Sequence, residues 1–386
     1  MFFKLSALYF AYFSLLGVLV PYLGLYLESR NFSLLEIAEL ASMLMLTKII
    51  APLVWGSIAD KYQCSLLLVR IGSVLTLASF SGFFFAETFW QFVMVIFMFS
   101  FFWNAILPQI EVITLNALAG RQDRYSQIRL WGSIGFVASV MGAGFLFERI
   151  GVSNFPYVAL SIIVTIFLLS LLKFSEPPHP GYDLDSASFL AQLLKSDIVL
   201  FFLICFLLQL SHGAYYTYFS IYLESLDYSK STIGLLWSVG VLAEVTLFVV
   251  MHKWFSRHSV KEIMFVSLLL TSIRWFLTSK YANDIQALVL LQLLHAFSFG
   301  AMHAAAIKFV HQKFDQKNQG RAQALYSSFG FGLGGAVGAL TSGMIVSHSD
   351  YECVFEFSAV VAMLGLVICT FMPSKSVNST SPHTRR

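Results

Sequence analysis

The sequence predicts an all-α integral membrane protein with twelve transmembrane helices in two six-helix bundles. Three observations support this prediction: the composition, the length of the apolar runs and a repeat between the two halves. The chain is 58% hydrophobic and only 12% charged. A soluble domain carries roughly 25% charged residues, so the composition excludes a water-soluble globular fold.

The apolar runs number six in each half. They cover residues 5–27, 35–58, 65–86, 88–117, 127–147 and 155–173, and then 196–222, 231–252, 261–280, 284–309, 322–347 and 352–372. About 20 apolar residues are needed for a helix to cross the hydrocarbon core. The strands of a membrane β-barrel are about 10 residues of alternating polarity, so these runs indicate helices, which satisfy their own backbone in lipid.

The two halves repeat one another. Gly17 and Tyr22 return as Gly213 and Tyr218 at an offset of 196, and Tyr-Leu-Glu-Ser at 26–29 returns at 222–225. Such repeats are typical of secondary transporters. We expect an N-terminal bundle over residues 1–174, a cytoplasmic linker at 175–195, a C-terminal bundle over 196–372 and a disordered cytoplasmic tail at 373–386.

Small residues are concentrated in the fifth and eleventh runs, which hold equivalent places in the repeat. The eleventh has Gly at 330, 332, 334, 335 and 338. Small residues let helices approach closely in lipid. We expect these two helices to lie where the bundles meet and slide, or alternatively to serve static packing alone.

Basic residues are distributed unevenly between the loops. With the N-terminus inside, 14 Lys and Arg fall on the cytoplasmic side, whereas the outer loops hold Arg30, Arg149, Lys230 and Lys280. The positive-inside rule therefore predicts that both termini are cytoplasmic. No basic patch suggests a nucleic acid partner, and the four scattered cysteines indicate neither a disulfide framework nor a metal site.

Ionisable side chains inside apolar runs are the candidate functional residues, because placing a charge in the membrane core costs several kcal/mol of free energy. Glu111 and Arg129 lie on consecutive helices of one hairpin, where they form either a functional pair or a structural bridge. Glu244, Arg274 and His295 lie on three successive helices. An acid, a fixed cation and an imidazole suit proton-coupled transport.

Two further groups have alternative interpretations. The ammonium of Lys48 either faces a cavity or extends on its flexible side chain to the membrane–water interface. His303 is a cavity residue or a hydrogen-bonded core histidine. The chain has no nucleotide-binding loop and no nucleophile motif, so we expect a transporter that is not an enzyme, has no cofactor and is driven by a proton gradient.

Several motifs resemble the major facilitator superfamily. The segment 56–61, Gly-Ser-Ile-Ala-Asp-Lys, is similar to its cytoplasmic signature loop, which implies a gating role for Gly56, Asp60 and Lys61. Asn104, Glu111 and Arg129 resemble, more distantly, the sugar-binding region of the lactose permease, which implies substrate binding. Glu244, Arg274 and His295 also resemble the coupling residues of that permease, but Gln292 and Ser298 stand where it has a lysine and its proton-carrying glutamate.

The phenylpropionate permease family, the 3-phenylpropionic acid transporters of Gram-negative bacteria, has similar motifs along nearly the whole chain. They lie at residues 129–133, 212–216, 240–245, 274–275 and 292–295. The resemblance implies proton symport of a small aromatic carboxylate such as 3-phenylpropionate into the cell across the bacterial inner membrane.

The residues themselves leave the substrate open. A carboxylate needs a cation, which Arg274, Lys48 or Arg129 could supply, and its ring needs an apolar slot. The alternatives are a sugar or nucleoside proton symporter and an efflux permease. The expected partners are the substrate, the proton and the lipid bilayer, with the protein as a monomer.

Overall fold

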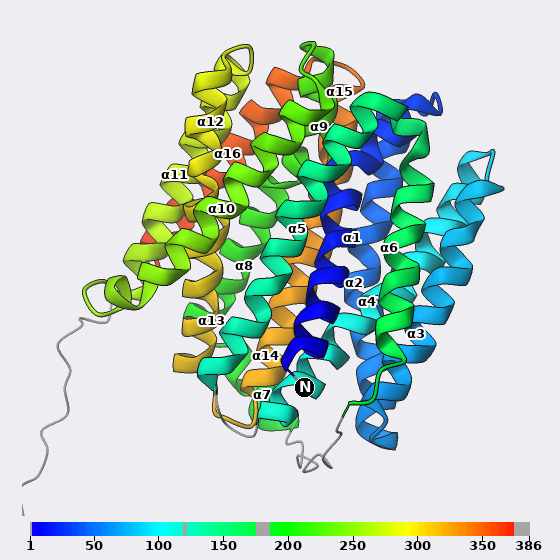
Figure 1. Ribbon diagram of the computed structural model, residues 1–386. Coiled ribbons are helices and arrows are strands. Elements are labelled where there is room, and N and C mark those ends of the chain that lie inside the picture. Colours follow the sequence, from blue (N-terminus) through cyan, green and yellow to red (C-terminus); the bar gives the residue numbers. More distant parts are fainter. Residues whose placement is uncertain (1, 119–121, 175–185, 374–386) are drawn as a thin grey trace, which may run out of the picture.

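The computed structural model describes residues 2–118, 122–174 and 186–373 (Figure 1). Of residues 60, 122–123 and 186–188 it describes the backbone alone. Most of the predicted linker and nearly all of the predicted tail therefore lie outside the described residues.

The first half consists of six long helices. They are α1 (Phe2–Ser29), α2 (Leu34–Tyr62), α3 (Ser65–Phe80), α4 (Phe89–Leu118), α5 (Gln122–Ile150) and α6 (Phe155–Ser170), with short 3₁₀ turns η1 (Ser81–Phe84) and η2 (Val152–Asn154). α2 begins with a capping box, in which Ser33 and Glu36 each accept a hydrogen bond from the other's backbone N–H.

The second half follows a short helix, α7 (Ser186–Leu193), and three of its spans are interrupted. Its elements are α8 (Ser196–Ser211), α9 (Gly213–Ser225), α10 (Lys230–Phe255), α11 (Val260–Tyr281), α12 (Ile285–Leu293), the π-helical η3 (Ala296–Ala301), α13 (Met302–Lys313), α14 (Gln319–Tyr326), the π-helical η4 (Ser327–Gly334), α15 (Gly335–Val346) and α16 (Tyr351–Thr370).

The predicted fold class is confirmed. In the described residues, 11 segments are long and apolar enough to cross a membrane. The twelfth span, α11, is 22 residues long but carries Lys261, Glu262, Arg274 and Lys280, which make it more polar. The interruptions in the seventh, tenth and eleventh spans did not follow from the apolar pattern, because hydrophobicity does not report a local change of helix pitch.

The sequence repeat corresponds to equivalent packing in the two halves. Gly17 and Gly213 each lie so close to a neighbouring helix that a side chain would not fit. A Cβ on Gly17 would lie 2.3 Å from Oγ of Ser139 in α5, and a Cβ on Gly213 would lie 2.2 Å from the backbone of Gly338 in α15. Tyr26 stacks on Phe155 at the start of α6, and Tyr222 stacks on Tyr351 at the start of α16, each with centroids 5.1 Å apart. The repeated residues therefore hold equivalent helices together.

The two small-residue helices lie between the halves, as predicted. α5 packs on α10, and η4 with α15 packs on α2. A Cβ on Gly144 would lie 2.5 Å from the carbonyl oxygen of Lys230, and one on Gly332 would lie 2.5 Å from Cγ1 of Ile49. These glycines permit close contact between the halves.

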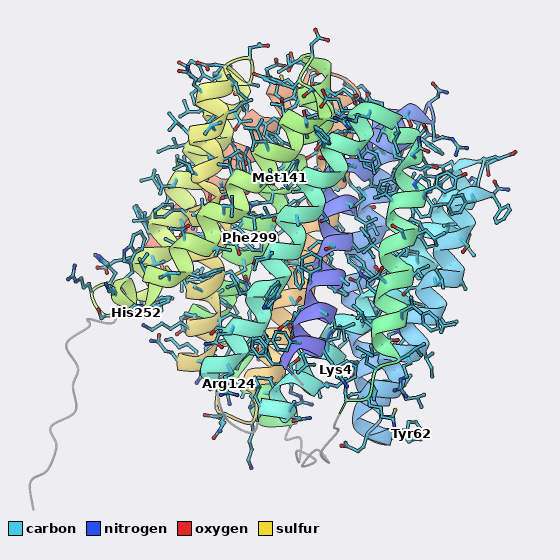
Figure 2. All side chains as sticks on the ribbon, in the orientation of Figure 1. Lys4, Tyr62, Arg124, Met141, His252 and Phe299 are labelled. Atoms are coloured by element: carbon cyan, nitrogen blue, oxygen red, sulfur yellow. The ribbon has the colours of Figure 1, made fainter. Side chains whose placement is uncertain are left out.

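The hydrogen bonds between the halves gather at one end. Lys4, Tyr62, Arg124 and His252 mark what we call the lower end (Figure 2). Among the described residues, the bonds that join the halves lie at the opposite, upper end. They run from the Tyr218 hydroxyl to Leu34 O (2.6 Å), from the Tyr22 hydroxyl to Lys230 O (3.4 Å) and from Ser231 N to a Glu148 carboxylate oxygen (3.2 Å).

Candidate functional site

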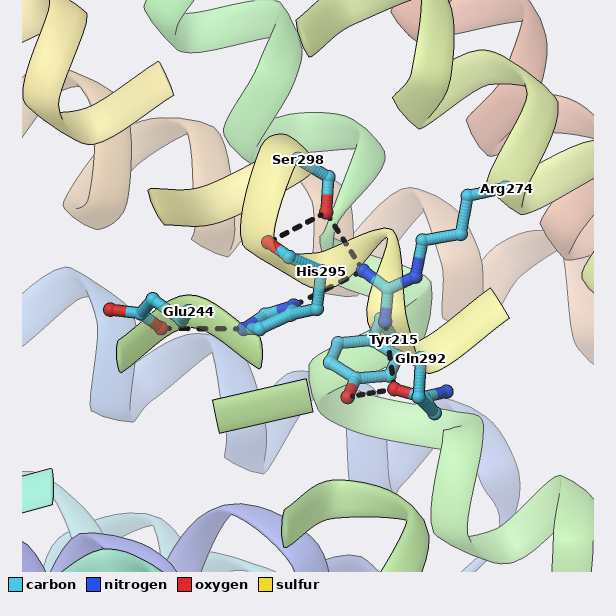
Figure 3. Close-up of polar contacts among 6 residues, drawn as sticks. All are labelled: Tyr215, Glu244, Arg274, Gln292, His295 and Ser298. Atoms are coloured by element: carbon cyan, nitrogen blue, oxygen red, sulfur yellow. Dashed lines mark hydrogen bonds and ion pairs between the residues drawn. The ribbon is translucent and has the colours of Figure 1, made fainter. Parts of the chain in front are cut away.

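Arg274 lies at the centre of a polar network within the second half (Figure 3). Its side chain is 0% exposed. Nη1 donates to Nδ1 of His295 (3.1 Å) and to Oγ of Ser298 (2.9 Å), and Nη2 donates to Oε1 of Gln292 (3.0 Å). These three acceptors follow one another at three-residue spacing, where α12 passes into the π-helical η3.

Aromatic rings flank the same guanidinium. Its Cζ lies 4.5 Å from the ring centroid of Tyr215 and 4.4 Å from that of Trp275. The Tyr215 hydroxyl also donates to Gln292 Oε1 at 2.9 Å. Neutral acceptors and ring faces together stabilise a buried cation, and no carboxylate of a described residue lies within 4 Å of it.

Glu244 approaches this network from α10 through His295. Its Oε2 lies 3.8 Å from His295 Nε2, and the two side chains are 15% and 7% exposed. His295 therefore lies between Glu244 and Arg274 (Figure 3). The structure brings together the three groups that the sequence placed on successive helices.

In the first half the charged groups have fewer direct partners. The Arg129 guanidinium stacks over the ring of Phe13 at 4.0 Å and lies 5.9 Å from the ring of Tyr9. Both Glu111 and Arg129 are described, and they attract one another without a contact ion pair within 4 Å. Arg129 also lies within electrostatic range of Glu244 and His303 in the other half.

Lys48 lines a cavity between the halves. The cavity is formed by α1, α2, α4 and α9, and its lining includes Leu16, Val20, Leu44, Lys48, Trp103 and Tyr216. The ammonium of Lys48 lies 3.5 Å from the Met45 sulfur, and no acid in the described part of the chain contacts it within 4 Å. Trp103 stacks on Tyr12 with centroids 5.1 Å apart.

Asn104 and His303 have partners within their own halves. Asn104 Nδ2 donates to Thr47 Oγ1 (2.9 Å), and Thr47 in turn donates to Ser100 Oγ (2.9 Å), which connects α2 to α4. His303 Nδ1 lies 3.0 Å from the Tyr326 hydroxyl. Part of the hydrogen-bonding capacity of each side chain is therefore used in helix packing.

The predicted gating loop is helical over most of its length. α2 continues through Gly56 and Lys61 to Tyr62, and the chain turns at Gln63, which has φ 51°. The apolar run ends near residue 58, but no helix breaker follows until this left-handed residue, so the helix continues. A Cβ on Gly56 would meet nothing within 4 Å, and the Asp60 side chain lies outside the described residues.

Tyr215, Gln292 and Ser298 were not predicted as site residues. The spacing of Gln292, His295 and Ser298 at i, i+3 and i+6 was the available signal, because such residues can share one helical face. The described residues hold no group of three or more His, Cys, Asp or Glu suited to a metal ion.

Comparison with known proteins identifies the family. The profile described as "MFS_1 like family" matches residues 2–357. The chain belongs to this family. It is therefore a multi-pass membrane transporter of the major facilitator type and not an enzyme, as the sequence predicted.

Relatives and solved structures agree with this assignment. The chain is 27% identical to the Escherichia coli protein named "Probable 3-phenylpropionic acid transporter", over 92% of this chain and 93% of that one. It is 24% identical to the maltose permease of Geobacillus stearothermophilus, over 95% and 93%. A crystal structure of a mutant of nucleoside transporter NupG matches with a TM-score of 0.85 at 19% identity, over 96% of this chain and 99% of that one, which shows the shared fold.

Proposed function

We propose that this transporter is a proton symporter that imports a small aromatic carboxylate, such as 3-phenylpropionate, across the bacterial inner membrane. The observation that carries the proposal is the ammonium of Lys48, which has no acid partner within 4 Å among the described residues and faces a cavity lined by aliphatic and aromatic side chains. The 3-phenylpropionic acid transporter among the relatives supports the same substrate class.

The lining of the cavity suits an aromatic acid better than a sugar. A charge-assisted hydrogen bond to Lys48 stabilises the carboxylate by about 1.5–3 kcal/mol, and the aromatic side chains of Trp103 and Tyr216 belong to the same lining. Arg274 is less suited to this role, since it is 0% exposed and its two terminal nitrogens donate to His295, Ser298 and Gln292.

Proton coupling is assigned to the second half, where Glu244, His295 and Arg274 form one chain of contacts. Glu111 and Arg129 complete the site from the first half. The lower end, which carries the basic loops, is then the cytoplasmic end with both termini. In this proposal the protein works as a monomer without a cofactor, and the proton gradient supplies the free energy.

A nucleoside symporter is the second candidate. It is favoured by the structural match to the nucleoside transporter and by 24% identity to the nucleoside permease NupG of Escherichia coli. The aromatic residues in the cavity lining, Trp103 and Tyr216, could contact a base as well as a phenyl ring. Sugar uptake is less well supported by the apolar lining of this cavity, and an efflux permease is the remaining alternative.

The test uses purified protein in liposomes that contain a pH-sensitive dye. External 3-phenylpropionate, a nucleoside and a disaccharide are added separately, with empty liposomes as the control for passive entry of the free acid. We expect protein-dependent internal acidification with the aromatic acid and its loss in Lys48→Met. Lys317→Met, at an exposed lysine between α13 and α14, is the matched control. Acidification only with the nucleoside or only with the disaccharide would contradict the proposal that the substrate is an aromatic carboxylate.

A further inference from the structure

The contact between Arg274 and His295 determines which imidazole nitrogen carries the hydrogen. Arg274 Nη1 lies 3.1 Å from His295 Nδ1. A guanidinium has donors and no acceptor, so Nδ1 must be the acceptor. The neutral imidazole then carries its hydrogen on Nε2, the atom that lies 3.8 Å from Oε2 of Glu244.

The same contact opposes a second proton on His295. That proton would have to occupy Nδ1, where it would face the guanidinium, replace an accepted hydrogen bond by a donor–donor contact and place two cations side by side. His212 also lies within electrostatic range of His295. The Glu244 carboxylate favours a charged imidazole, but it lies 3.8 Å away, beyond hydrogen-bond distance. The rings of Tyr215 and Phe299 lie 5.8 and 5.4 Å from the imidazole between centroids.

The surroundings of Glu244, unlike those of His295, leave room for an added proton. His295 presents Nε2–H to one of its oxygens, and the other groups within electrostatic range are Arg129 of α5 and the Tyr216 hydroxyl of α9. Its methylene packs on Gly300, where a Cβ would approach Glu244 Cγ to 2.9 Å. Arg129 favours the ionised carboxylate, but no hydrogen bond from a described residue occupies either Glu244 oxygen, since His295 Nε2 is 3.8 Å away. Either oxygen can therefore accept a proton.

We propose that Glu244 is the group that binds the transported proton, and that Arg274 and His295 are positioning residues that keep the imidazole neutral with its hydrogen on Nε2. This inference rests on the proton coupling of the proposed function. An O–H bond forms on the carboxylate when a proton arrives from water on one side of the membrane. The same bond breaks when the proton leaves to water on the other side.

The position of Glu244 connects its charge to the arrangement of the halves. Arg129 belongs to the first half and Glu244 to the second, and they attract one another across the interface between α5 and α10. Protonation of Glu244 removes this attraction. Movement of one half against the other changes the field of Arg129 at Glu244, so protonation and conformation influence one another.

The first experiment is independent of substrate. The pH titration of the carboxylic acid carbonyl band is followed by infrared difference spectroscopy on the purified protein in liposomes. We expect one titrating component to disappear in Glu244→Gln and to persist in His295→Asn, in which the amide oxygen can still accept from Arg274. Glu111→Gln is the matched control at a carboxyl group in a membrane-spanning helix of the first half. Persistence of the full titration in Glu244→Gln would overturn the proposal.

The second experiment separates exchange from accumulation. We expect Glu244→Gln to keep substrate exchange between the two sides of the membrane, to lose accumulation driven by a pH gradient at least tenfold, and to lose its pH dependence. His295→Asn should retain gradient-driven accumulation with a displaced pH profile. Exchange without accumulation in His295→Asn would assign the proton to the imidazole and overturn the proposal.

A folding defect is distinguished by a conservative variant. If Glu244→Gln does not give a monodisperse protein, Glu244→Asp keeps the acid and should displace the pH midpoint of transport, whereas an unchanged midpoint contradicts the proposal. If the wild-type protein moves no proton with any substrate, the proposed function fails. The infrared titration then still decides whether Glu244 is the proton-binding group.

Discussion

The two halves share a fold and a sequence repeat but hold their charges differently. In the second half, Arg274 is enclosed by His295, Gln292, Ser298 and two aromatic rings. In the first half, Lys48 and Arg129 lie against a sulfur and a ring and contact no carboxylate within 4 Å among the described residues. A cation bound by its own protein is committed to that structure, whereas a cation with weak partners is available for a ligand.

This difference suggests a division of labour in the site. A buried cation is tolerated when neutral acceptors and ring faces replace its hydration, as they do for Arg274. The site in the second half is therefore preorganised. Lys48 lies at the cavity, where an incoming carboxylate can supply the missing partner.

The largest effect is expected from Arg274→Ala. Accumulation should fall to the level of empty liposomes, and each acceptor left unpaired in the buried network should cost about 1–3 kcal/mol of stability. Uptake and the thermal midpoint in detergent measure the two effects. Arg274→Lys should keep the charge but lose the forked hydrogen bonds, so it should recover stability only in part. Full uptake by Arg274→Ala would remove Arg274 from the site.

Lys48→Met should instead change binding and leave stability intact. Loss of one charge-assisted hydrogen bond corresponds to about a 10- to 100-fold rise in KM for the aromatic acid, because the substrate alone supplies the acid partner. The thermal midpoint should stay within about 2 °C of the wild type, since a change of 1 kcal/mol corresponds to roughly 2–4 °C in large domains. An unchanged KM would contradict the role given to Lys48.

Gly144→Val tests the contact between the halves at the upper end. Its Cβ would meet both the Lys230 carbonyl and the Tyr22 hydroxyl at 2.5 Å, whereas Gly142→Val is a matched control with nothing within 4 Å. We expect Gly144→Val to favour opening at this end. A cysteine at Val20, with the four native cysteines replaced by Ser, should then be labelled from outside about tenfold faster, a shift of about 1.4 kcal/mol. Equal rates in the two variants would exclude this role.

The smallest effect is expected from Asn104→Ala. Loss of its hydrogen bond to Thr47 should cost about 0.6–1.7 kcal/mol, as for other interhelical bonds in membranes. Uptake by the properly folded variant should stay within about twofold of the wild type, a difference well below 1 kcal/mol. A large loss of uptake at normal stability would place Asn104 at the substrate, as its resemblance to sugar-binding residues implies.

Particular residues show how far the sequence could predict the site. Glu244, Arg274 and His295 were identified because ionisable groups are rare in apolar runs, and they do lie in one cluster. Gln292, Ser298 and Tyr215 were not identified as site residues, since a neutral polar residue in a helix is a weaker signal than a charged one, and the three-residue spacing around His295 was the signal that was available. Glu111 and Arg129 were predicted to form a pair, but the Arg129 guanidinium stacks over Phe13 and the two groups form no contact ion pair within 4 Å.

The sequence by itself determined the membrane location, the twelve helices and the equivalence of the halves, because apolar length, backbone satisfaction in lipid and repetition are all properties of the linear chain. Tertiary structure alone decided which charges meet. The π-helical segments rotate the faces of their spans, and the glycines of α5 and α15 set how closely the helices approach. A hydrogen bond forms only within a few tenths of an ångström of its ideal length, and that distance depends on how all the helices pack together.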